Sequence, residues 1–281
     1  MKIKFATLAL LAAILPGTIL AQNNDKFYSG DKNNPFTQED KKFNDWAISA
    51  GVGVPLVQSA DLTSIKNGNG KNLFGYSAYL SVDKAITHAF GLNLQYEMGE
   101  TKQGLVNVKK DAGLGARTQY QALSLLGDIN FSNLLRRSDN HSPFRWALHG
   151  YAGVGTLGYK AYRQDADPLN PNNKLGENLI TENKFLKKFS MFGQAGAGLK
   201  FNVNRTIDIE GRVMYVVTGD DNFDGGSGNV YQLNSINAKE EQYSDNFINA
   251  TLGITLKLGK HASHLMWHDP LQEIYYRLDV L

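Results

Sequence analysis

The sequence contains no cysteine among its 281 residues. Disulfides, thiolate metal sites and lipid attachment to a cysteine at a cleavage site are therefore excluded. An excess of one charge sign is also lacking, since 29 Lys and Arg stand against 27 Asp and Glu, for a formal net charge of +2. Because no basic face dominates such a chain, a nucleic-acid partner is not expected.

Hydrophobic runs long enough for a membrane helix, about 20 residues, are absent as well. The run from Phe5 to Leu15 follows two lysines and precedes Ala21, the last residue before a polar stretch. This order is typical of a secretory signal peptide, which we place at residues 1–21. We expect an exported chain in which the polar residues 22–44 form a periplasmic lead-in.

Glycine and aromatic residues are plentiful, with 28 Gly, 13 Tyr and 14 Phe. The segment from Phe90 to Met98 alternates strictly between apolar residues and Gly or polar residues. A period of two predicts an extended strand with one wholly apolar face. About nine residues also suffice for a tilted strand to cross a membrane. A soluble sandwich strand would show the same alternation, so its recurrence has to decide.

Eight segments share this alternation, at residues 46–54, 76–82, 90–98, 121–131, 146–158, 191–201, 207–217 and 248–258. Eight is an even number and the smallest common size of an outer-membrane barrel. Short turns at 83–89 and 202–206 and an intermediate connection at 132–145 contrast with long polar loops at 55–75, 99–120, 159–190 and 218–247. The pattern predicts an all-β fold, an eight-stranded antiparallel transmembrane β-barrel over residues 45–258. Long loops would lie outside the cell and both chain ends in the periplasm.

A ring of aromatic residues supports a barrel over a secreted sandwich. On the apolar faces, at the strand ends next to the short turns, stand Trp46, Phe90, Phe131, Trp146 and Phe201. Aromatic girdles at one height mark a membrane interface. We therefore expect these five residues to form the periplasmic girdle.

By the same parity, charged and polar side chains point into the barrel. The predicted lumen network comprises Asp83, Glu97, Asp128, His149, Lys200, Asp208, Glu210, Arg212 and Lys257, with Tyr79 and Tyr151 beside them. An eight-stranded barrel is wide enough only for side chains, so one interpretation is a cross-linked polar plug. The alternative is a narrow gated pore, in which inward glycines leave space for water; these are Gly51, Gly53, Gly153, Gly196 and Gly198.

Catalysis and metal binding have weaker support. His149 with Ser124 or Glu97 could serve a lipid-modifying barrel enzyme, but strand position separates His149 from Glu97, and we expect no enzyme and no cofactor. Asp220, Asn222 and Asp224 are spaced like the first half of a calcium loop. Tyr231 replaces the bidentate Glu expected at the twelfth position, so no metal site is predicted.

Small residues interrupt the lipid-facing side of the fifth and sixth predicted strands, at Gly150, Ala152, Gly193, Ala195 and Ala197. Small residues let another surface approach closely in a membrane, while glycine can also serve strand curvature. We hypothesise that this small-residue patch contacts an envelope protein or a second copy, in addition to outer-membrane lipid.

After residue 258 the sequence cannot form another strand, and Asp269 with Pro270 predicts a short periplasmic helix in the tail, residues 259–281. The Gly- and Ala-rich strands, Ile48 to Val54 and Tyr151 to Gly155, resemble the N-terminal barrel of OmpA-family outer-membrane proteins. His264 to Leu271 is similar to the stretch that follows such barrels in Bacteroidota-type members. The resemblance implies a structural barrel of a Gram-negative outer membrane.

Members of that family also carry a C-terminal domain that grips peptidoglycan through Asp and Arg positions. Residues 259–281 are too short for that domain, so those positions cannot be carried over. We therefore expect a structural or scaffolding barrel, with partners bound through the small-residue patch or the tail. A small-solute channel is the runner-up, and a lipid-modifying enzyme is the third alternative.

Overall fold

The computed structural model describes residues 42–59, 72–103, 114–135, 145–167, 170–186, 190–225, 244–261 and 263–268. All of them belong to one of the chain's two compact units, Thr37–Gln272. Within these residues, no helix combines the length and the apolar character needed to span a membrane. The predicted signal peptide, most of the lead-in and the predicted helix after Asp269 lie outside the described residues.

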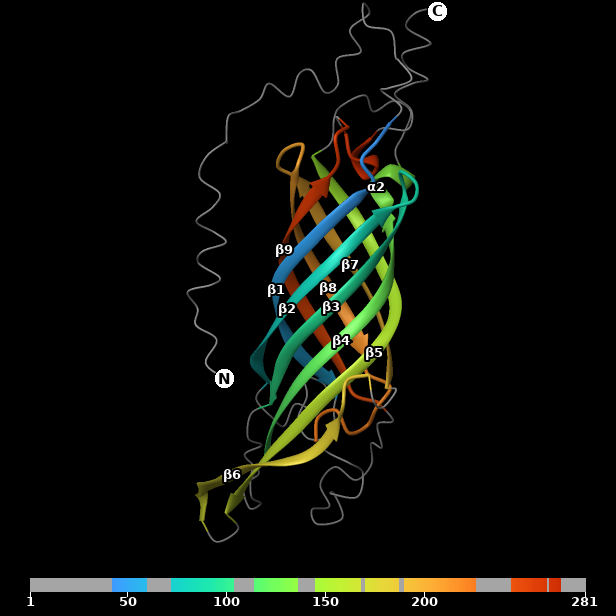
Figure 1. Cartoon of the computed structure of the whole chain (residues 1–281). Coiled ribbons are helices and arrows are strands. Elements are labelled where there is room, and N and C mark those ends of the chain that lie inside the picture. Colours follow the sequence, from blue (N-terminus) through green and yellow to red (C-terminus); the bar gives the residue numbers. More distant parts are fainter. Residues whose placement is uncertain are drawn as a thin grey trace, which may run out of the picture. The chain divides into compact units, whose positions relative to one another are not determined.

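Antiparallel strands dominate this unit. They are β1 Trp46–Ser59, β2 Asn72–Ala85, β3 Phe90–Gln103, β4 Leu114–Asn130, β5 Trp146–Asp167, β6 Asn170–Asn183, β7 Met191–Asn202, β8 Ile207–Val217 and β9 Asn246–Leu258. Their order in the sheet is β4-β3-β2-β1-β9-β8-β7-β5-β6, and an additional β4–β5 pairing closes it. Of the nine strands only β6 lies outside the closed ring, so the barrel has eight strands, as the alternation predicts (Figure 1).

The alternation of the sequence explains both surfaces of the barrel. Along β9, buried and outward side chains alternate from Phe247 to Leu258. Outward side chains are large and apolar, and Leu252 and Val154 are 62% and 57% exposed. Such a continuous apolar outer wall is suited to acyl chains, and closure leaves no unpaired strand edge in lipid. The chain is a transmembrane β-barrel.

The two rims differ. One, here called the turn rim, carries the turns at residues 86–89 and 203–206, the short helix α2 (Phe131–Leu134) and the residues that follow β9. The opposite rim, the loop rim, carries β6 and the ends of the longer connections (Figure 1). Among the described residues beyond β9, one short 3-10 helix, η3, spans Leu265–Trp267.

Most strands extend beyond the predicted segments, as β1 does to Ser59 and β3 to Gln103, and two of the differences change the kind of element. The fourth strand ends at Asn130, whose side chain caps α2, so Phe131 begins a helix instead of ending a strand. The predicted loop at residues 159–190 contains the second half of β5 and all of β6, which pair with each other. This hairpin extends past the apolar band and therefore needs no apolar outer face, so the alternation of the sequence gave no signal for it.

Candidate functional site

The candidate site is the barrel lumen, and at the turn rim it is closed by the plug segment (residues 263–268). Asn44, just before β1, holds this segment through a parallel bridge to His264. The Asn44 N–H donates to the Ser263 carbonyl at 3.0 Å, and the Leu265 N–H donates to the Asn44 carbonyl at 2.8 Å. The chain segment just before β1 and the segment just after β9 are thus joined across the mouth of the barrel at the turn rim.

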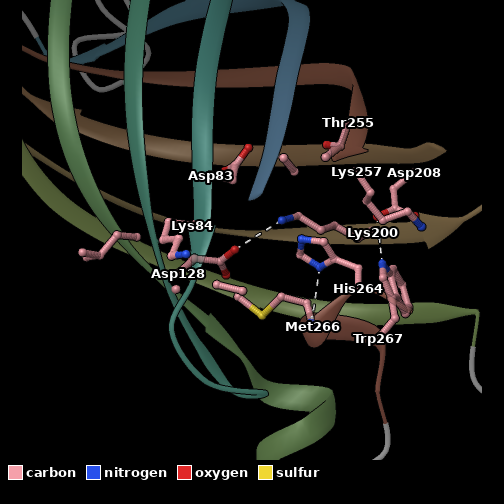
Figure 2. A pocket seen from close by; sticks show the side chains of 14 residues that line it. Asp83, Lys84, Asp128, Lys200, Asp208, Thr255, Lys257, His264, Met266 and Trp267 are labelled. Carbon is pink, nitrogen blue, oxygen red and sulfur yellow. Dashed lines mark hydrogen bonds and ion pairs between the residues drawn. The ribbon is translucent and has the colours of Figure 1, made fainter. Parts of the chain in front are cut away.

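Side chains of the plug segment enter the lumen. Trp267, 5% exposed, donates its indole N–H to Asp208 Oδ2 at 2.8 Å, and Lys257 Nζ lies 2.6 Å from Asp208 Oδ1. Figure 2 shows the Trp267 indole reaching up toward Asp208 and Lys257. The Met266 carbonyl accepts from the amides of Asn130 and Asn133, both at 2.9 Å. Asp208 therefore fastens the plug segment to the barrel wall.

His264 is a buried titratable residue of the plug segment. Its pKa is lowered from 6.5 to about 3, mainly by burial and in addition by the positive charges of Lys257 and Lys200, against smaller opposing effects of Asp45 and of a hydrogen bond with the Trp46 backbone. The imidazole is therefore neutral in the closed barrel at neutral pH.

On the lumen side of the plug segment, a buried ionic group joins three strands. Asp128 on β4 lies with Oδ1 2.6 Å from His149 Nδ1 on β5 and with Oδ2 3.2 Å from Lys200 Nζ on β7. All three side chains are at least 90% buried. Charges this deep are tolerated only when paired, so the arrangement cross-links the wall.

A second group occupies the middle of the lumen. Arg212 lies with its guanidinium 4.2 Å from the Tyr79 ring centroid and 5.3 Å from that of Tyr151. Its Nε is 3.8 Å from Glu210 Oε1, which also accepts from the Tyr151 hydroxyl. The cation is thus held between two aromatic faces and a carboxylate, an arrangement that gains from both cation–π and ionic attraction.

Two further carboxylates are satisfied by neutral donors. Glu97 accepts from the Tyr120 hydroxyl at 2.8 Å, the Asn249 amide at 2.7 Å and the Gln95 amide at 2.9 Å. Asp83 accepts from the Ser49 hydroxyl at 2.6 Å and from the Asn93 amide. Both therefore belong to the same cross-linked interior as the ionic groups.

Near the loop rim, aromatic side chains fill the lumen in place of charged ones. Phe223, from the turn after β8, stacks on Phe247 with ring centroids 5.5 Å apart and planes at 10°, and lies 5.4 Å from Tyr159. The Thr118 hydroxyl donates to the Phe223 carbonyl at 2.6 Å. The buried loop-rim cluster comprises Tyr120, Ala122, Leu157, Tyr159, Ala161, Phe192, Val216, Phe223 and Phe247.

The inward glycines make room for side chains. A Cβ on Gly51 would lie 2.5 Å from Tyr79, one on Gly196 2.7 Å from Met214, and one on Gly198 2.7 Å from Arg212. At these three positions large side chains therefore occupy the space beside the glycine.

The nine predicted lumen residues all lie inside the barrel, and their ion pairs join Asp128 to Lys200, Asp208 to Lys257 and Glu210 to Arg212. The imagined catalytic set is not brought together. His149 pairs with Asp128, whereas Ser124 accepts from Gln194 at 2.9 Å. Glu97 is held by the donors described above.

The calcium candidates are engaged in local contacts. Asp220 accepts from the Tyr159 hydroxyl at 2.6 Å and from the Asn222 backbone at 3.1 Å, while the Asp224 N–H donates to Asp245 at 2.9 Å. Within the described residues no group of three or more His, Cys, Asp or Glu is arranged to hold a metal.

Of the predicted girdle residues, Trp46, Phe90 and Trp146 are exposed on the outer wall at the turn rim, and the half-buried Phe201 packs against Trp146 with ring centroids 4.5 Å apart. Phe131 differs, because its ring lies against Gly150: a Cβ there would be 2.5 Å from Phe131 Cε2. Gly150 is therefore not an open part of the small-residue patch. At Gly193 an added Cβ would have nothing within 4 Å, so that part of the patch is open.

Sequence reasoning missed the plug segment and the loop-rim cluster. Trp267 and Met266 follow the last strand without any period, and their partners Asp208 and Asn130 are far away in the chain. For the cluster a signal existed. Phe192, Val216 and Phe247 are large apolar residues at inward positions in the outer halves of their strands, which indicates an apolar closure.

No protein-family model matches the chain, and no curated protein does. Among solved structures, the outer membrane protein OprG from Pseudomonas aeruginosa is similar at 11% identity, covering 78% of this chain and 98% of that chain with a TM-score of 0.41. Neisserial surface protein A is similar at 11% identity over 76% and 97%, with a TM-score of 0.40. Ail from Yersinia pestis is similar at 10% identity over 77% and 100%, with a TM-score of 0.40. At these values the likenesses assign no function.

Proposed function

We propose that this chain is a non-conducting structural barrel of a bacterial outer membrane. The observation that carries the proposal is the filled lumen: the plug segment closes the turn rim, two ionic groups occupy the middle, and aromatic side chains close the loop rim. A pocket bounded by the mouth residues has about 20 Å³ of space, enough for about one water molecule. Such an interior favours a rigid scaffold over a conduit.

Planar bilayers test this proposal directly. We expect the purified chain to give no steady ionic current, because the lumen side chains form hydrogen-bonded and ionic contacts from one rim to the other. A variant with a shortened lumen side chain, Arg212→Ala, and a lipid-facing control on the same strand, Val213→Ala, should both remain silent, since the two closures stay in place. Steady single-channel openings of the unaltered chain would support the channel alternative and end the proposal.

A scaffold protein functions by binding partners. We propose that the open part of the small-residue patch is the surface that contacts a partner within the membrane. Gly193 and Ala195 on β7 and Ala152 on β5 share the outer wall, with Ala152 opposite Ala195 and Val154 opposite Gly193. The partner would be a second envelope protein or another copy. Gly193→Leu should lower its recovery in affinity purification from intact envelopes, whereas Leu199→Ala on the same face should not. Equal recovery from both variants would remove this contact surface.

The orientation follows from the same proposal. The longer connections and the β5–β6 hairpin would face the outside, and both chain ends would be periplasmic, in keeping with the predicted signal peptide and the resemblance to OmpA-family barrels. A protease added to intact cells should then cut within residues 218–247, after β8, and spare the turn at 203–206. Cleavage at residues 203–206 would reverse the orientation.

A further inference from the structure

The outer wall changes character along β3, β4 and β5 as these strands leave the apolar band toward the loop rim. On β3 the last apolar outward side chain is the exposed Met98, and the next positions of the same parity are Glu100 and Lys102. On β4 and β5 the outward residues near this height include Arg117 and Lys160. A border between apolar and charged side chains on a membrane barrel marks the level of the lipid headgroups.

Two cations of this border lie directly opposite each other. Lys102 on β3 faces Arg117 on β4 in the strand register, and like charges in that arrangement repel. They share one carboxylate, with Lys102 Nζ 3.3 Å from Glu100 Oε1 and Arg117 Nη1 3.0 Å from Glu100 Oε2. The Arg117 guanidinium also lies 4.6 Å from the Tyr162 ring centroid, which holds it on the outer face. A further negative group beside this pair would therefore be attracted.

Two more cations continue the border onto β5 and the residues after β6. Lys160 Nζ lies 3.1 Å from Glu182 Oε1, and the positive charge of Lys184 acts on the same carboxylate. The four residues here called the border cations are Lys102, Arg117, Lys160 and Lys184. Their carboxylate partners are Glu100 and Glu182, so this part of the border has an excess of positive charge.

The border cations are confined to one side of the barrel. At the loop-rim ends of β1, β2, β7, β8 and β9, no outward residue that the structure describes is Lys or Arg. The outward residues there are uncharged, namely Leu56, Gln58, Phe74, Tyr76, Met191, Val217 and Asn246. Cations that served only to keep the rim in water would be expected all around it. Their one-sided placement favours a localised ligand.

Next to the border cations, the chain after β6 covers the outer wall with apolar side chains. Its backbone crosses β5 so closely at Gly158 that an added Cβ there would lie 2.5 Å from the Phe185 backbone. Phe185 meets Tyr96 on β3 edge-to-face, with ring centroids 6.1 Å apart. Leu186 follows with φ at 61°, a conformation that leucine rarely adopts, and its side chain is 65% exposed. A strained backbone thus presents a large apolar side chain close to the cations.

We propose that this border binds a lipid that carries phosphate on its headgroup, in the leaflet at the loop rim. The border cations hold the phosphate oxygens, and Met98, Phe185 and Leu186 contact the ends of the acyl chains nearest the headgroup. Arginine suits this role because its fork of N–H donors matches two phosphate oxygens at once. The aliphatic stems of the lysines can lie along apolar surface while their ammonium groups reach the headgroup.

A phosphate-bearing lipid uses both parts of the border. A soluble anion would gain from the cations alone, and an uncharged lipid would gain from the apolar side chains alone. The site goes beyond the proposed function and does not depend on it, because a barrel of either orientation, conducting or silent, presents the same border to one leaflet. Loss of this site would leave the non-conducting barrel standing, and the reverse also holds.

Native mass spectrometry of the full chain released from detergent measures this binding. The probes are phosphatidic acid, diacylglycerol with the same acyl chains, and inorganic phosphate. We expect phosphatidic acid to bind at least about tenfold more tightly than diacylglycerol, and an excess of inorganic phosphate to leave it bound. Equal affinity for the two lipids would overturn the proposal. Displacement of phosphatidic acid by inorganic phosphate would also overturn it, because the cations would then serve a free anion.

Charge variants locate the site. In Arg117→Gln with Lys160→Gln, each carboxylate keeps another border cation as a neighbour, and heat-modifiable mobility on gels checks that the barrel still folds. The affinity for phosphatidic acid should fall at least about tenfold. The matched control, Arg205→Gln with Lys260→Gln, removes two cations at the turn rim and should change that affinity by less than about twofold. An unchanged affinity in the border variant, or an equal loss in the control, would overturn the assignment.

A tryptophan at residue 186 tests the apolar half of the site. In the protein with Trp46→Phe and Trp146→Phe, adding Leu186→Trp should add emission that bromines near the headgroup end of the acyl chains quench more strongly than bromines at mid-chain. Emission that acrylamide quenches and brominated lipid does not would place this side chain in water. The proposed contact with acyl chains would then be wrong.

Discussion

Replacing Lys257 by Met is expected to destabilise the barrel and to loosen the plug segment, because the substitution leaves Asp208 as a buried carboxylate without its cation. Asp208 is 3% exposed and has two side-chain partners, Lys257 at 2.6 Å and the Trp267 indole at 2.8 Å. Removing one member of a buried ion pair typically costs about 3–5 kcal/mol. The indole N–H alone cannot replace a full positive charge.

Removing the carboxylate instead of the ammonium group, in Asp208→Asn, is expected to lower the free energy of unfolding by less. In Asp208→Asn the ammonium of Lys257 keeps two other oxygen acceptors, the Asn204 carbonyl at 2.8 Å and Asn202 Oδ1 at 3.2 Å. The double variant Lys257→Met with Asp208→Asn removes both charges together, while the amide oxygen can still accept from Trp267. We expect it to recover at least about 2 kcal/mol of the loss in Lys257→Met, because no unpaired charge remains.

Urea titration in lipid vesicles, followed by tryptophan fluorescence, gives these differences in the free energy of unfolding. Lys260→Met, an exposed lysine on the same rim, is the matched control and should change that free energy by less than about 0.5 kcal/mol. If the double variant is as unstable as the sum of the two single variants, the two side chains are not coupled. The reasoning about the plug anchor would then be refuted.

Two further predictions concern the two closures. His264 is neutral when the plug segment is docked and has an ordinary pKa of 6.5 when the segment is released. Its contribution to the free energy of docking is therefore fully present above pH 6.5 and is lost as the pH falls toward about 3. By pH 5 the free energy of docking should be weaker by about 2 kcal/mol. In a protein with Trp46→Phe and Trp146→Phe, the emission of Trp267 should shift to the red between pH 7 and pH 5, and a pH-independent spectrum would contradict this. At the loop rim, Phe223→Ala should cost about 3–5 kcal/mol locally and speed amide hydrogen exchange in residues 218–225, whereas Phe74→Ala, at a side chain 75% exposed, should leave that exchange unchanged.

The sequence predicts the barrel wall well, because each membrane-crossing strand must expose apolar side chains on one face only. Phe90 to Met98 and residues 248–258 show this alternation in full, and both lie in strands whose exposure alternates in the same way. Beyond the apolar band that constraint ends. The outer half of β5 and all of β6 carry charged and amide residues in no fixed order, so the alternation predicts no strand there.

Inside the lumen, parity predicts which side chains point inward but not which ones meet. Asp128 and Lys200 are 72 residues apart, and their contact depends on the register of three strands. Plug closure is harder still, because Trp267 lies outside every strand and reaches Asp208 only through the chain's return across the mouth. A single sequence contains no local signal for such a contact, whereas the inward aromatic residues near the loop rim did provide one.

Fluorescence quenching by brominated acyl chains tests the central claim most directly, namely that the outer wall contacts lipid while the interior is filled. In the protein with Trp46→Phe and Trp146→Phe, Trp267 should be unquenched by bromines in the membrane and by acrylamide in water. Adding Leu252→Trp, at a position 62% exposed on the outer wall, should add emission that mid-chain bromines quench strongly. Emission from the Leu252→Trp protein that acrylamide quenches and brominated lipid does not would contradict the account.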